Sequence, residues 1–560
     1  MITPKHNERR RGRTERENTG DFILRGYLNV CLNGLFECFN IIYAYIIFLS
    51  IRSERYINSL RICNVIHTYP IHTIHTIHTI QYPYFHIMSV KSVYGEVITP
   101  RAFAREMLLT TLPAHLFQNP DLKWLDAGAG QGCFSAVLRE ILNETLAAVM
   151  PPDMDAATRD KHIVTKMLHM VELNPDNIAH HLRPMFGPGA NIYEADYTSW
   201  NACCSVDVII GNPPFNCGGA IKVPTNAAAD KHNDGRTIWP QFVMKNLQIL
   251  RANQAGGGFM CILVPSIWLK PADKSGIFAA LISCPDPARI HTITRLRCFT
   301  SLQANRIFRS GGGAQTPCCY FSLETRPHLS HLQSNTSTFT SNAMKCIELV
   351  DDISGSGSGS CKYIQYSVDP PRPIPLNCAG IINKLAAQMP HPGAHVRVLK
   401  TNMPPKGTTF GPPDMTASTP EYPYPCVHSC ILDAHTKEPR LVIRYSSRPC
   451  AYAGIPKIIL AHKMYGHPVI DISGVYGISN RDNYVVEIER DVTGAAPDAE
   501  WARQMQRYLS SPIARLVYDA TRYRMQFLER YAFELLSMPP PSLHCLEPEE
   551  LEYIVRKYGS

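Results

Sequence analysis

The stretch from Val206 to Phe215 combines residue types that could hold a polar ligand in one fixed geometry. A strand-like apolar run leads through a glycine into Asn-Pro-Pro-Phe. Pro213 and Pro214 fix their own φ angles, and Pro213 also moves Asn212 out of the α region. The Asn212 side chain and the neighbouring carbonyls are therefore held at a strand end, beside the flat ring of Phe215. An ordinary loop is the competing interpretation of this stretch taken alone.

A glycine-rich turn lies upstream, between a short apolar strand and an expected helix. The strand ends at Asp126, and glycines follow at every second position: Gly128, Gly130 and Gly132. Glycines there let the backbone approach a ligand closely, and the N-terminus of the next helix presents free N–H groups. A dinucleotide fingerprint needs a glycine three positions after Gly130, where Cys133 stands instead. The spacing therefore disfavours a bound pyrophosphate.

Two further strand ends carry acidic residues. A strand expected over 169–173 delivers Glu172, and a third short strand delivers Asp196 and Tyr197. Singly, each acid is more often a solvated carboxylate than a ligand. Their order favours a binding site, because ligands of open α/β sheets lie beyond the carboxyl ends of the strands. Further upstream, Thr99 followed by a proline is a typical helix start.

In this order, the glycine turn, the two acids and the Asn-Pro-Pro-Phe turn resemble a class I S-adenosylmethionine-dependent methyltransferase. The group in question is the DNA adenine methyltransferases, in the gamma arrangement that puts the cofactor motifs first and the recognition region last. The resemblance covers about residues 94–325, and the segment from Glu96 to Pro100 is similar to the one that caps the cofactor. It implies an α/β protein: a Rossmann-like methyltransferase domain, then a mixed α/β recognition domain with a helical end.

The resemblance also implies a role for each motif residue. The catalytic residues would be Asn212, Pro213, Pro214 and Phe215, and S-adenosylmethionine would be bound by Thr99, Asp126, Gly128, Gly130, Gly132, Glu172, Asp196 and Tyr197. Glu172 would accept the ribose hydroxyls, and Asp196 would accept the adenine amino group of the cofactor. Phe215 stands where the family more often has tyrosine, which removes a hydroxyl and keeps the stacking face. No metal is implied.

The implied function is site-specific methylation of N6 of adenine in double-stranded DNA after base flipping. The Asn212 side-chain oxygen and the Pro213 carbonyl would accept both amino hydrogens and favour a pyramidal, nucleophilic nitrogen. A protein glutamine or an RNA base is an alternative acceptor, since related Asn-Pro-Pro turns serve such enzymes. The sequence also allows the methyltransferase part of a restriction–modification enzyme, or a catalytically inactive DNA-binding protein.

The 560 residues exceed one typical core, and composition divides the chain into four parts. Globular patterning begins just after Met88, so residues 1–87 are expected to be a non-globular extension outside the true protein; a membrane anchor within it is the alternative. We expect the methyltransferase domain over 88–330, a flexible Ser- and Gly-rich linker over 331–376 and a DNA target-recognition domain with C-terminal helices over 377–560.

The composition is that of a soluble globular protein, with 45% hydrophobic and 18% charged residues. A net charge of +8 permits a polyanionic partner such as DNA. The 19 cysteines are scattered and indicate reduced thiols in a cytoplasmic compartment. Cys426 and Cys430 flank a histidine, but no second pair stands at zinc-finger spacing, so we expect no metal. We expect a monomer that is cytoplasmic or associated with nucleic acid, without stable membrane association.

Overall fold

The structure is a computed structural model. It describes residues 94–217, 236–252, 258–271, 275–283, 289–309, 316–327, 346–351, 362–368, 371–401, 403–432, 439–462, 467–490, 493–494, 496–524 and 528–559. The extension expected over 1–87, its alternative as a membrane anchor and the Gly-Ser tract 354–360 lie outside these residues.

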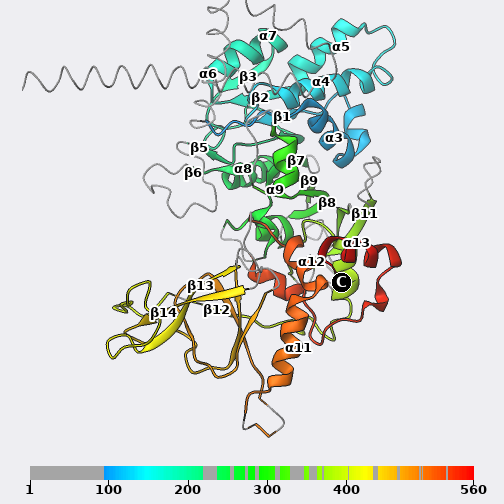
Figure 1. The fold of residues 1–560 in the computed structure, drawn as a ribbon. Helices are drawn as coiled ribbons and strands as arrows, with labels where there is room; N and C mark the ends of the chain where they lie inside the picture. The colour runs from blue at the N-terminus through cyan, green and yellow to red at the C-terminus, as the bar shows by residue number, and fades with distance from the viewer. Residues whose placement is uncertain are drawn as a thin grey trace, which may run out of the picture. The chain divides into compact units, whose positions relative to one another are not determined.

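A nine-stranded sheet forms the centre of the described N-terminal half (Figure 1). Its strand order is β11-β10-β8-β9-β7-β4-β1-β2-β3. The strands are β1 (Trp124–Ala127), β2 (Leu168–Glu172), β3 (Asn191–Glu194), β4 (Val208–Gly211), β7 (Gly258–Pro265), β8 (Arg289–Phe299), β9 (Cys318–Pro327), β10 (Cys346–Asp351) and β11 (Lys362–Ser367).

The strand directions agree with the Rossmann-like domain expected from the sequence. Strands β3, β2, β1, β4 and β7 are parallel neighbours. Strand β9 runs antiparallel to both β7 and β8. Since β2 and β3 lie on one side of β1 while β4 and β7 lie on the other, the chain reverses its direction of progress across the sheet between β1 and β4. The α/β fold class is confirmed.

Helices cover both faces of the sheet, as the continuous apolar runs in its strands require. In β4, Val208 and Ile210 point into the core shared with α3 (Arg101–Thr111) and α4 (Cys133–Leu146). Ile209 points into the opposite core, which includes α8 (Trp239–Ala252). The remaining elements of this half are η1 (Ala114–Gln118), α5 (Ala156–His162), η2 (Ile163–Met167), α6 (Pro175–Asn177), η3 (Ile178–Leu182), α7 (Arg183–Phe186), β5 (Asn216–Cys217), β6 (Arg236–Thr237), η4 (Ser266–Leu269), η5 (Ala279–Ser283) and α9 (Ser301–Ile307).

Strands β10 and β11 correct the expected linker, because both lie within residues 331–376. Strand β10 pairs in parallel with β8 and antiparallel with β11. Ile347 and Leu349 are buried while Glu348 and Val350 are partly exposed, which is the period of a half-buried strand. This alternation is hard to recognise in the sequence because the neighbouring stretch is rich in Ser, Thr and Gly.

The C-terminal part is mixed α/β with a helical end, as expected. One sheet has the order β12-β18-β15-β16, and another has the order β14-β13-β17. Its elements are α10 (Ala379–Ala386), β12 (Leu399–Lys400), β13 (Tyr424–Leu432), β14 (Pro439–Ser446), β15 (Lys457–Ala461), β16 (Val469–Asp471), β17 (Gly477–Ile478), β18 (Asn483–Glu487), α11 (Ala499–Ser510), α12 (Pro512–Ala520), η8 (Arg530–Leu535), η9 (Leu543–Cys545) and α13 (Pro548–Tyr558).

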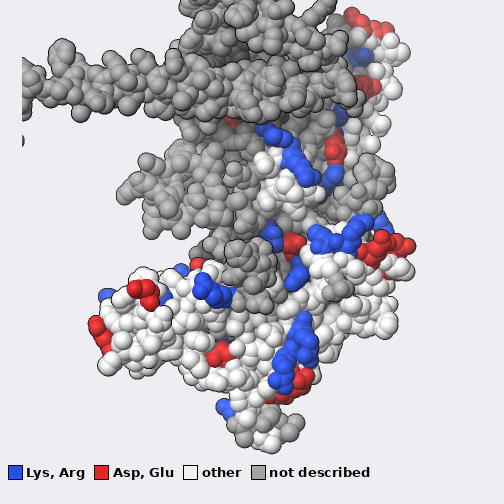
Figure 2. Space-filling view, in the orientation of Figure 1, with Lys and Arg blue, Asp and Glu red and all other residues white. Residues whose placement is uncertain are grey.

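The helical end shares one hydrophobic core with the nine-stranded sheet. Leu516 and Val517 of α12 belong to the same buried cluster as Phe321 of β9. The backbone N–H of Leu376 donates to Ala520 at 2.6 Å, which joins the two parts through the main chain as well. The outer side of α11 is charged instead, and Figure 2 shows basic and acidic side chains next to each other on the visible face.

A buried ion pair links two of the C-terminal strands. Lys457 of β15 donates to Asp471 of β16 at 2.7 Å, and both side chains are almost fully buried. The same carboxylate accepts the backbone N–H groups of Val475 and Tyr476 at 2.9 and 3.0 Å. Burial lowers the pKa of Lys457. This pair therefore fixes the turn that follows β16.

Candidate active site

The site expected from the sequence lies at the carboxyl ends of β1, β2 and β4. The register pairs Asp126 of β1 with Met170 of β2 and Ile210 of β4, so the three strands end at one edge of the sheet. Strand β1 is also where the strand order reverses, and α/β sheets bind ligands at that position. The topology therefore brings the glycine turn, Glu172 and Asn212 together.

The glycine turn requires glycine at its positions for two different reasons. Gly128, Gly130 and Gly132 all have positive φ angles, of 74°, 55° and 84°. A Cβ on Gly132 would lie 2.7 Å from Cδ2 of Leu182, so no larger residue fits there. The N–H of Gly128 donates to the carbonyl of Val171 at 3.0 Å, which anchors the turn to β2. Helix α4 begins directly after this turn.

Glu172 bonds directly to the glycine turn. Its Oε2 accepts the N–H of Gly130 at 2.7 Å, and its Oε1 accepts the N–H of Asn174 at 2.8 Å. The carboxylate is buried, and burial raises its pKa. Its position at the end of β2 is the one expected from the sequence.

Glu96 is a second acid of this site, and it is not among the binding residues expected from the sequence. Its Oε2 accepts the side-chain N–H of Asn177 at 3.1 Å, and its Oε1 lies 3.4 Å from the position of a Cβ on Gly130. Burial raises its pKa, and its negative charge also raises the pKa of Glu172. The signal in the sequence was an acid close before the Thr-Pro helix start.

Together, these acids give the edge of the sheet a negative character. Among the residues that the structure describes, neither Glu96 nor Glu172 forms an ion pair. Two such carboxylates favour hydroxyl donors or a cation and oppose a phosphate group. This electrostatic preference agrees with the exclusion of pyrophosphate that the spacing of the glycines predicted.

Asp126 is buried inside the sheet edge and does not face outward. Its Oδ2 accepts the backbone N–H of Ser135 at 3.1 Å and the Ser135 hydroxyl at 2.8 Å. Its Oδ1 lies 3.1 Å from the position of a Cβ on Gly211, the residue before Asn212. Burial raises the pKa of Asp126 to about 7. The side chain thus joins the first turn of α4 to the end of β4.

Asp196 and Tyr197 have different surroundings. Asp196 is exposed, and its Oδ1 accepts the N–H and the hydroxyl of Thr198 at 2.9 and 2.8 Å. Tyr197 is buried, donates its hydroxyl to Asn246 at 2.5 Å and stacks on Phe242 with 5.0 Å between ring centroids. The hydroxyl of Tyr197 is therefore bonded within the core, to a residue of α8. A cofactor contact of either residue stays a prediction.

The Asn-Pro-Pro-Phe turn packs against the segment that precedes α3. A Cβ on Gly95 would lie 1.7 Å from the backbone oxygen of Asn216, so the two backbones touch. Pro214 lies next to this contact and next to Gly128 of the glycine turn. Pro213 is buried, whereas the Phe215 ring is partly exposed. Three segments far apart in the sequence therefore meet at one point.

The side chain of Asn212 has one satisfied and one unsatisfied end. Its Nδ2 donates to the Thr99 hydroxyl oxygen at 3.1 Å. Its Oδ1 is buried and has no hydrogen-bond partner. An unsatisfied buried carbonyl costs about 1–3 kcal/mol, and a hydrogen bond from a ligand would offset that cost. This oxygen is available to accept a hydrogen bond from a ligand.

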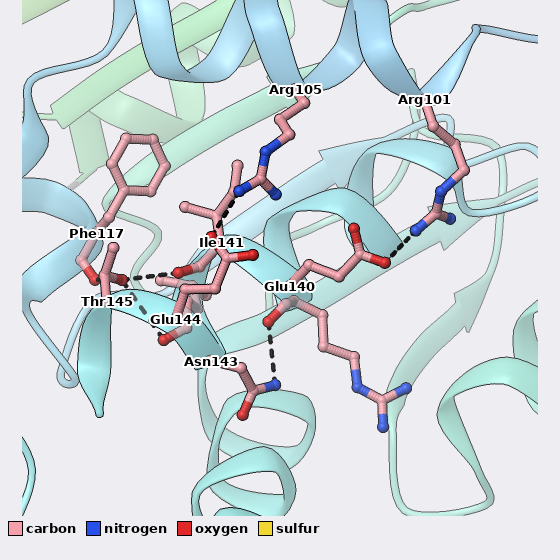
Figure 3. A network of polar contacts seen from close by, with 10 residues as sticks. Arg101, Arg105, Phe117, Glu140, Ile141, Asn143, Glu144 and Thr145 are labelled. Atoms are coloured by element: carbon pink, nitrogen blue, oxygen red, sulfur yellow. Dashed lines mark hydrogen bonds and ion pairs between the residues drawn. The ribbon is translucent and has the colours of Figure 1, made fainter. Parts of the chain in front are cut away.

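A ladder of ion pairs holds α3 against α4 (Figure 3). Arg101 pairs with Glu140, and Arg105 pairs with Glu144 one turn further along both helices. Both pairs are exposed, so each contributes little stability. Their repetition nevertheless fixes the relative position of the two helices. Because α3 follows the segment that touches Asn212 and α4 follows the glycine turn, the ladder connects the two halves of the site.

Sequence comparisons give no match to a model of a known protein family or to a curated protein. The solved structures that resemble the chain include the EcoKI M protein of a type I restriction enzyme, 17% identical over 47% of this chain and 49% of that chain, with a TM-score of 0.31. A modification subunit of a putative type I restriction enzyme from Vibrio vulnificus YJ016 is 15% identical over 52% and 54%, with a TM-score of 0.30.

A putative class I S-adenosylmethionine-dependent methyltransferase from Listeria monocytogenes is 14% identical over 43% of this chain and 64% of that chain, with a TM-score of 0.26. The chain spans about half the length of the two restriction-enzyme subunits.

Two further observations concern membrane spans and metal sites. In the part of the chain that the structure describes, no helix combines the length and the apolar character that crossing a bilayer needs. Within the same residues, no three His, Cys, Asp or Glu side chains are grouped so that they could hold a metal ion.

Proposed function

We propose that the chain is an S-adenosylmethionine-dependent methyltransferase that methylates N6 of adenine in double-stranded DNA. The observation that carries the proposal is the buried, unpartnered Oδ1 of Asn212, next to the glycine turn at the switch point of the sheet. An acceptor held in this way suits an exocyclic amino group, which must give up hydrogen bonds to water when it enters the site.

The residues present fit S-adenosylmethionine. The positive φ angles of the glycine turn let the backbone approach a ligand closely. Glu172 supplies a buried carboxylate and Glu96 a partly buried one for hydroxyl and cationic groups. Leu173 is 52% exposed next to Glu172, which offers an apolar surface to a planar ring. When bound, the cofactor would supply an electrophilic methyl group. Asp126 would support this site through Ser135 and Gly211 instead of touching the ligand.

The chain's own residues would prepare the acceptor. The amide oxygen of Asn212 and the carbonyl of Pro213 would each accept one amino hydrogen, which draws the nitrogen lone pair out of the ring system. The partly exposed Phe215 ring would stack on the extracted base. Most of the acceleration would then come from proximity and alignment, because no general base has to move during methyl transfer.

The C-terminal region would select the DNA sequence. Its two small sheets lie outside the nine-stranded sheet, and base-edge readout requires side chains that reach into a groove. Arg503 and Arg507 on α11 are exposed and share the single acid Glu500, so they retain positive charge for phosphate groups. We place methyl transfer in residues 88–330 together with β10 and β11, and target recognition in residues 377–560, with the chain acting as a monomer.

The test is a methyl-transfer assay with the full chain, labelled S-adenosylmethionine and duplex DNA, followed by separation of the nucleosides. Label in N6-methyl-2′-deoxyadenosine from the DNA supports the proposal. Parallel reactions contain RNA and total protein, because a protein glutamine or an RNA base is the alternative acceptor. Label only in RNA, in protein or in cytosine would contradict the proposed acceptor. Cleavage of the same DNA would indicate a combined restriction–modification enzyme.

A further inference from the structure

Thr99 is placed to control the orientation of Asn212. Its side chain is buried, with 6% of the residue exposed, and its hydroxyl oxygen accepts Nδ2 of Asn212 at 3.1 Å. Its backbone oxygen accepts the thiol of Cys133, the first residue of α4, at 3.1 Å. Thr99 therefore touches both the glycine-turn helix and the Asn-Pro-Pro-Phe turn.

The position of Thr99 is itself well fixed. Gly95, four residues earlier, packs against the backbone of Asn216, and α3 begins two residues later. Phe103 and Met107 of that helix are buried in the core that it shares with α4, next to the exposed ion pairs of Arg101 and Arg105. The hydroxyl is thus presented from a segment that is tied down on both sides, and it forms a rigid reference point for a neighbouring side chain.

An asparagine amide needs such a reference, because rotation about its last torsion is soft. Turned by half a revolution, the Asn212 amide would present N–H groups where it now presents Oδ1, and it would repel an amino group. The described structure gives Asn212 one side-chain hydrogen bond, to Thr99. With the hydroxyl accepting from Nδ2, the nitrogen lies on the Thr99 side and the oxygen is unpartnered. In the reversed amide the hydroxyl would donate to the oxygen instead, and the incoming amino group disfavours that arrangement because it would face N–H groups.

We propose that Thr99 is a positioning residue, whose hydroxyl holds the Asn212 amide nitrogen so that the amide oxygen faces the acceptor amine. This inference rests on the proposed function and assigns Thr99 a role different from the cofactor contact that the sequence implied. Thr99 acts through Asn212, so its loss affects the reaction step more than the binding of either substrate.

The test compares Thr99→Val, which keeps the shape and loses the hydroxyl, with Thr99→Ser, which keeps the hydroxyl. Single-turnover methylation is measured with the full chain at saturating cofactor and DNA, and the cofactor Kd is measured by calorimetry. We expect Thr99→Val to slow the reaction about tenfold, the upper range for one lost hydrogen bond, while the cofactor Kd changes less than twofold. Thr99→Ser should restore most of the rate.

A double-mutant cycle separates positioning from a general structural effect. Adding Thr99→Val to Asn212→Ala should slow the reaction no further, since the two side chains act as a unit. Thr111→Val is the matched control, because Thr111 is also buried on α3 and bonds only within the core, to the Met107 carbonyl and Cys261. Its rate should equal that of the wild type.

Three results would overturn the inference. Thr99→Val could raise the cofactor Kd and leave the saturated rate unchanged, which would make Thr99 a cofactor contact. It could lose as much rate in the Asn212→Ala background as in the wild type, which would make its effect independent of Asn212. A wild-type chain that methylates no adenine would reject the proposed function and this inference with it, and that failure is recognised before any variant is made.

Discussion

The backbone N–H of Gly130 lies 2.7 Å from Oε2 of Glu172, so the glycine turn is bonded to the acid that ends the next strand. Glu96 lies on the other side of Gly130. Two carboxylates and a positive-φ glycine thus form one continuous surface, built from three separate segments of the chain. The charge state of this surface should depend on pH.

The affinity for S-adenosylmethionine should increase with pH. Burial raises the pKa values of Glu96 and Glu172, and it raises that of Asp126 to about 7. As these groups ionise, the site becomes more negative, and the sulfonium and ammonium groups of the cofactor bind better. We expect the Kd to fall as the pH rises to and through about 7, the value to which the pKa of Asp126 is raised. Calorimetric titrations that also detect proton release measure this change.

The same groups should make the free chain less stable as the pH rises. Their folded-state pKa values lie above the ordinary ones. Their contribution to the free energy of unfolding is therefore complete below the ordinary pKa and is lost as the pH passes the folded value.

Glu172→Gln should flatten the pH dependence of the cofactor Kd. A variant with the slope of the wild type would remove Glu172 from the explanation.

Gly95→Ala should damage both folding and activity. Its Cβ would lie 1.7 Å from the Asn216 oxygen, and its φ of 71° is already unfavourable for alanine. We expect a loss of about 1–3 kcal/mol or more in the free energy of unfolding, since the backbone itself must move. Gly276→Ala is the matched control: its φ of 73° is close to that of Gly95, but nothing lies within 4 Å of its Cβ, so only the strain of the positive φ remains. Equal losses, measured by denaturant unfolding, would contradict the close contact.

The face of the Phe215 ring should contribute to catalysis by stacking on the base, and a hydroxyl on the ring should not be needed. Phe215→Tyr should therefore keep near wild-type kcat/KM. Phe215→Ala should lose base stacking worth about 1–3 kcal/mol, which appears as a lower kcat/KM for DNA. Thermal unfolding of both variants separates this effect from lost packing. An alanine variant with unchanged kcat/KM and unchanged Tm would show that the ring does not contact the base.

Asp471→Asn should destabilise the C-terminal part. The N–H groups of Val475 and Tyr476 bond to different oxygens of Asp471, so asparagine can accept only one of them. Lys457 would also keep a buried charge without its counter-ion. Breaking a buried pair in this way costs about 3–5 kcal/mol. The loss should be smaller at high pH, because burial already lowers the pKa of Lys457 and the neutral amine needs no partner. A pH-independent loss would contradict this account.

The sequence predicted the site where a local rule decides the geometry. Glycines at alternate positions, an acid at a strand end and prolines after Asn212 each act through their own backbone, and parallel strands bring such ends to one edge. Glu96 and Thr99 were harder to assign, because their contacts cross about 80 and 113 positions of the chain. No pattern in the sequence shows that Thr99 faces Asn212.

The distinction between local patterns and long-range contacts also explains where the fold differs from the fold expected from the sequence. Strand β10 was missed because its alternation is short and stands beside a Ser- and Gly-rich stretch. The shared core between α12 and the nine-stranded sheet depends on packing of residues about 200 positions apart, such as Phe321 and Leu516. An amphipathic helix predicts that one face is buried, but it does not show against which element.

The central claim is that the unpartnered oxygen of Asn212 receives the amino group of a DNA adenine. In the most direct measurement, duplex DNA is incubated with labelled S-adenosylmethionine and either the wild-type chain or Asn212→Ala. The DNA is then digested to nucleosides, which are separated. We predict label in N6-methyl-2′-deoxyadenosine for the wild type, and for the variant a much lower kcat with a nearly unchanged KM and cofactor Kd. A variant that labels adenine at the wild-type rate, or a wild-type chain that labels only cytosine, RNA or protein, would contradict the claim.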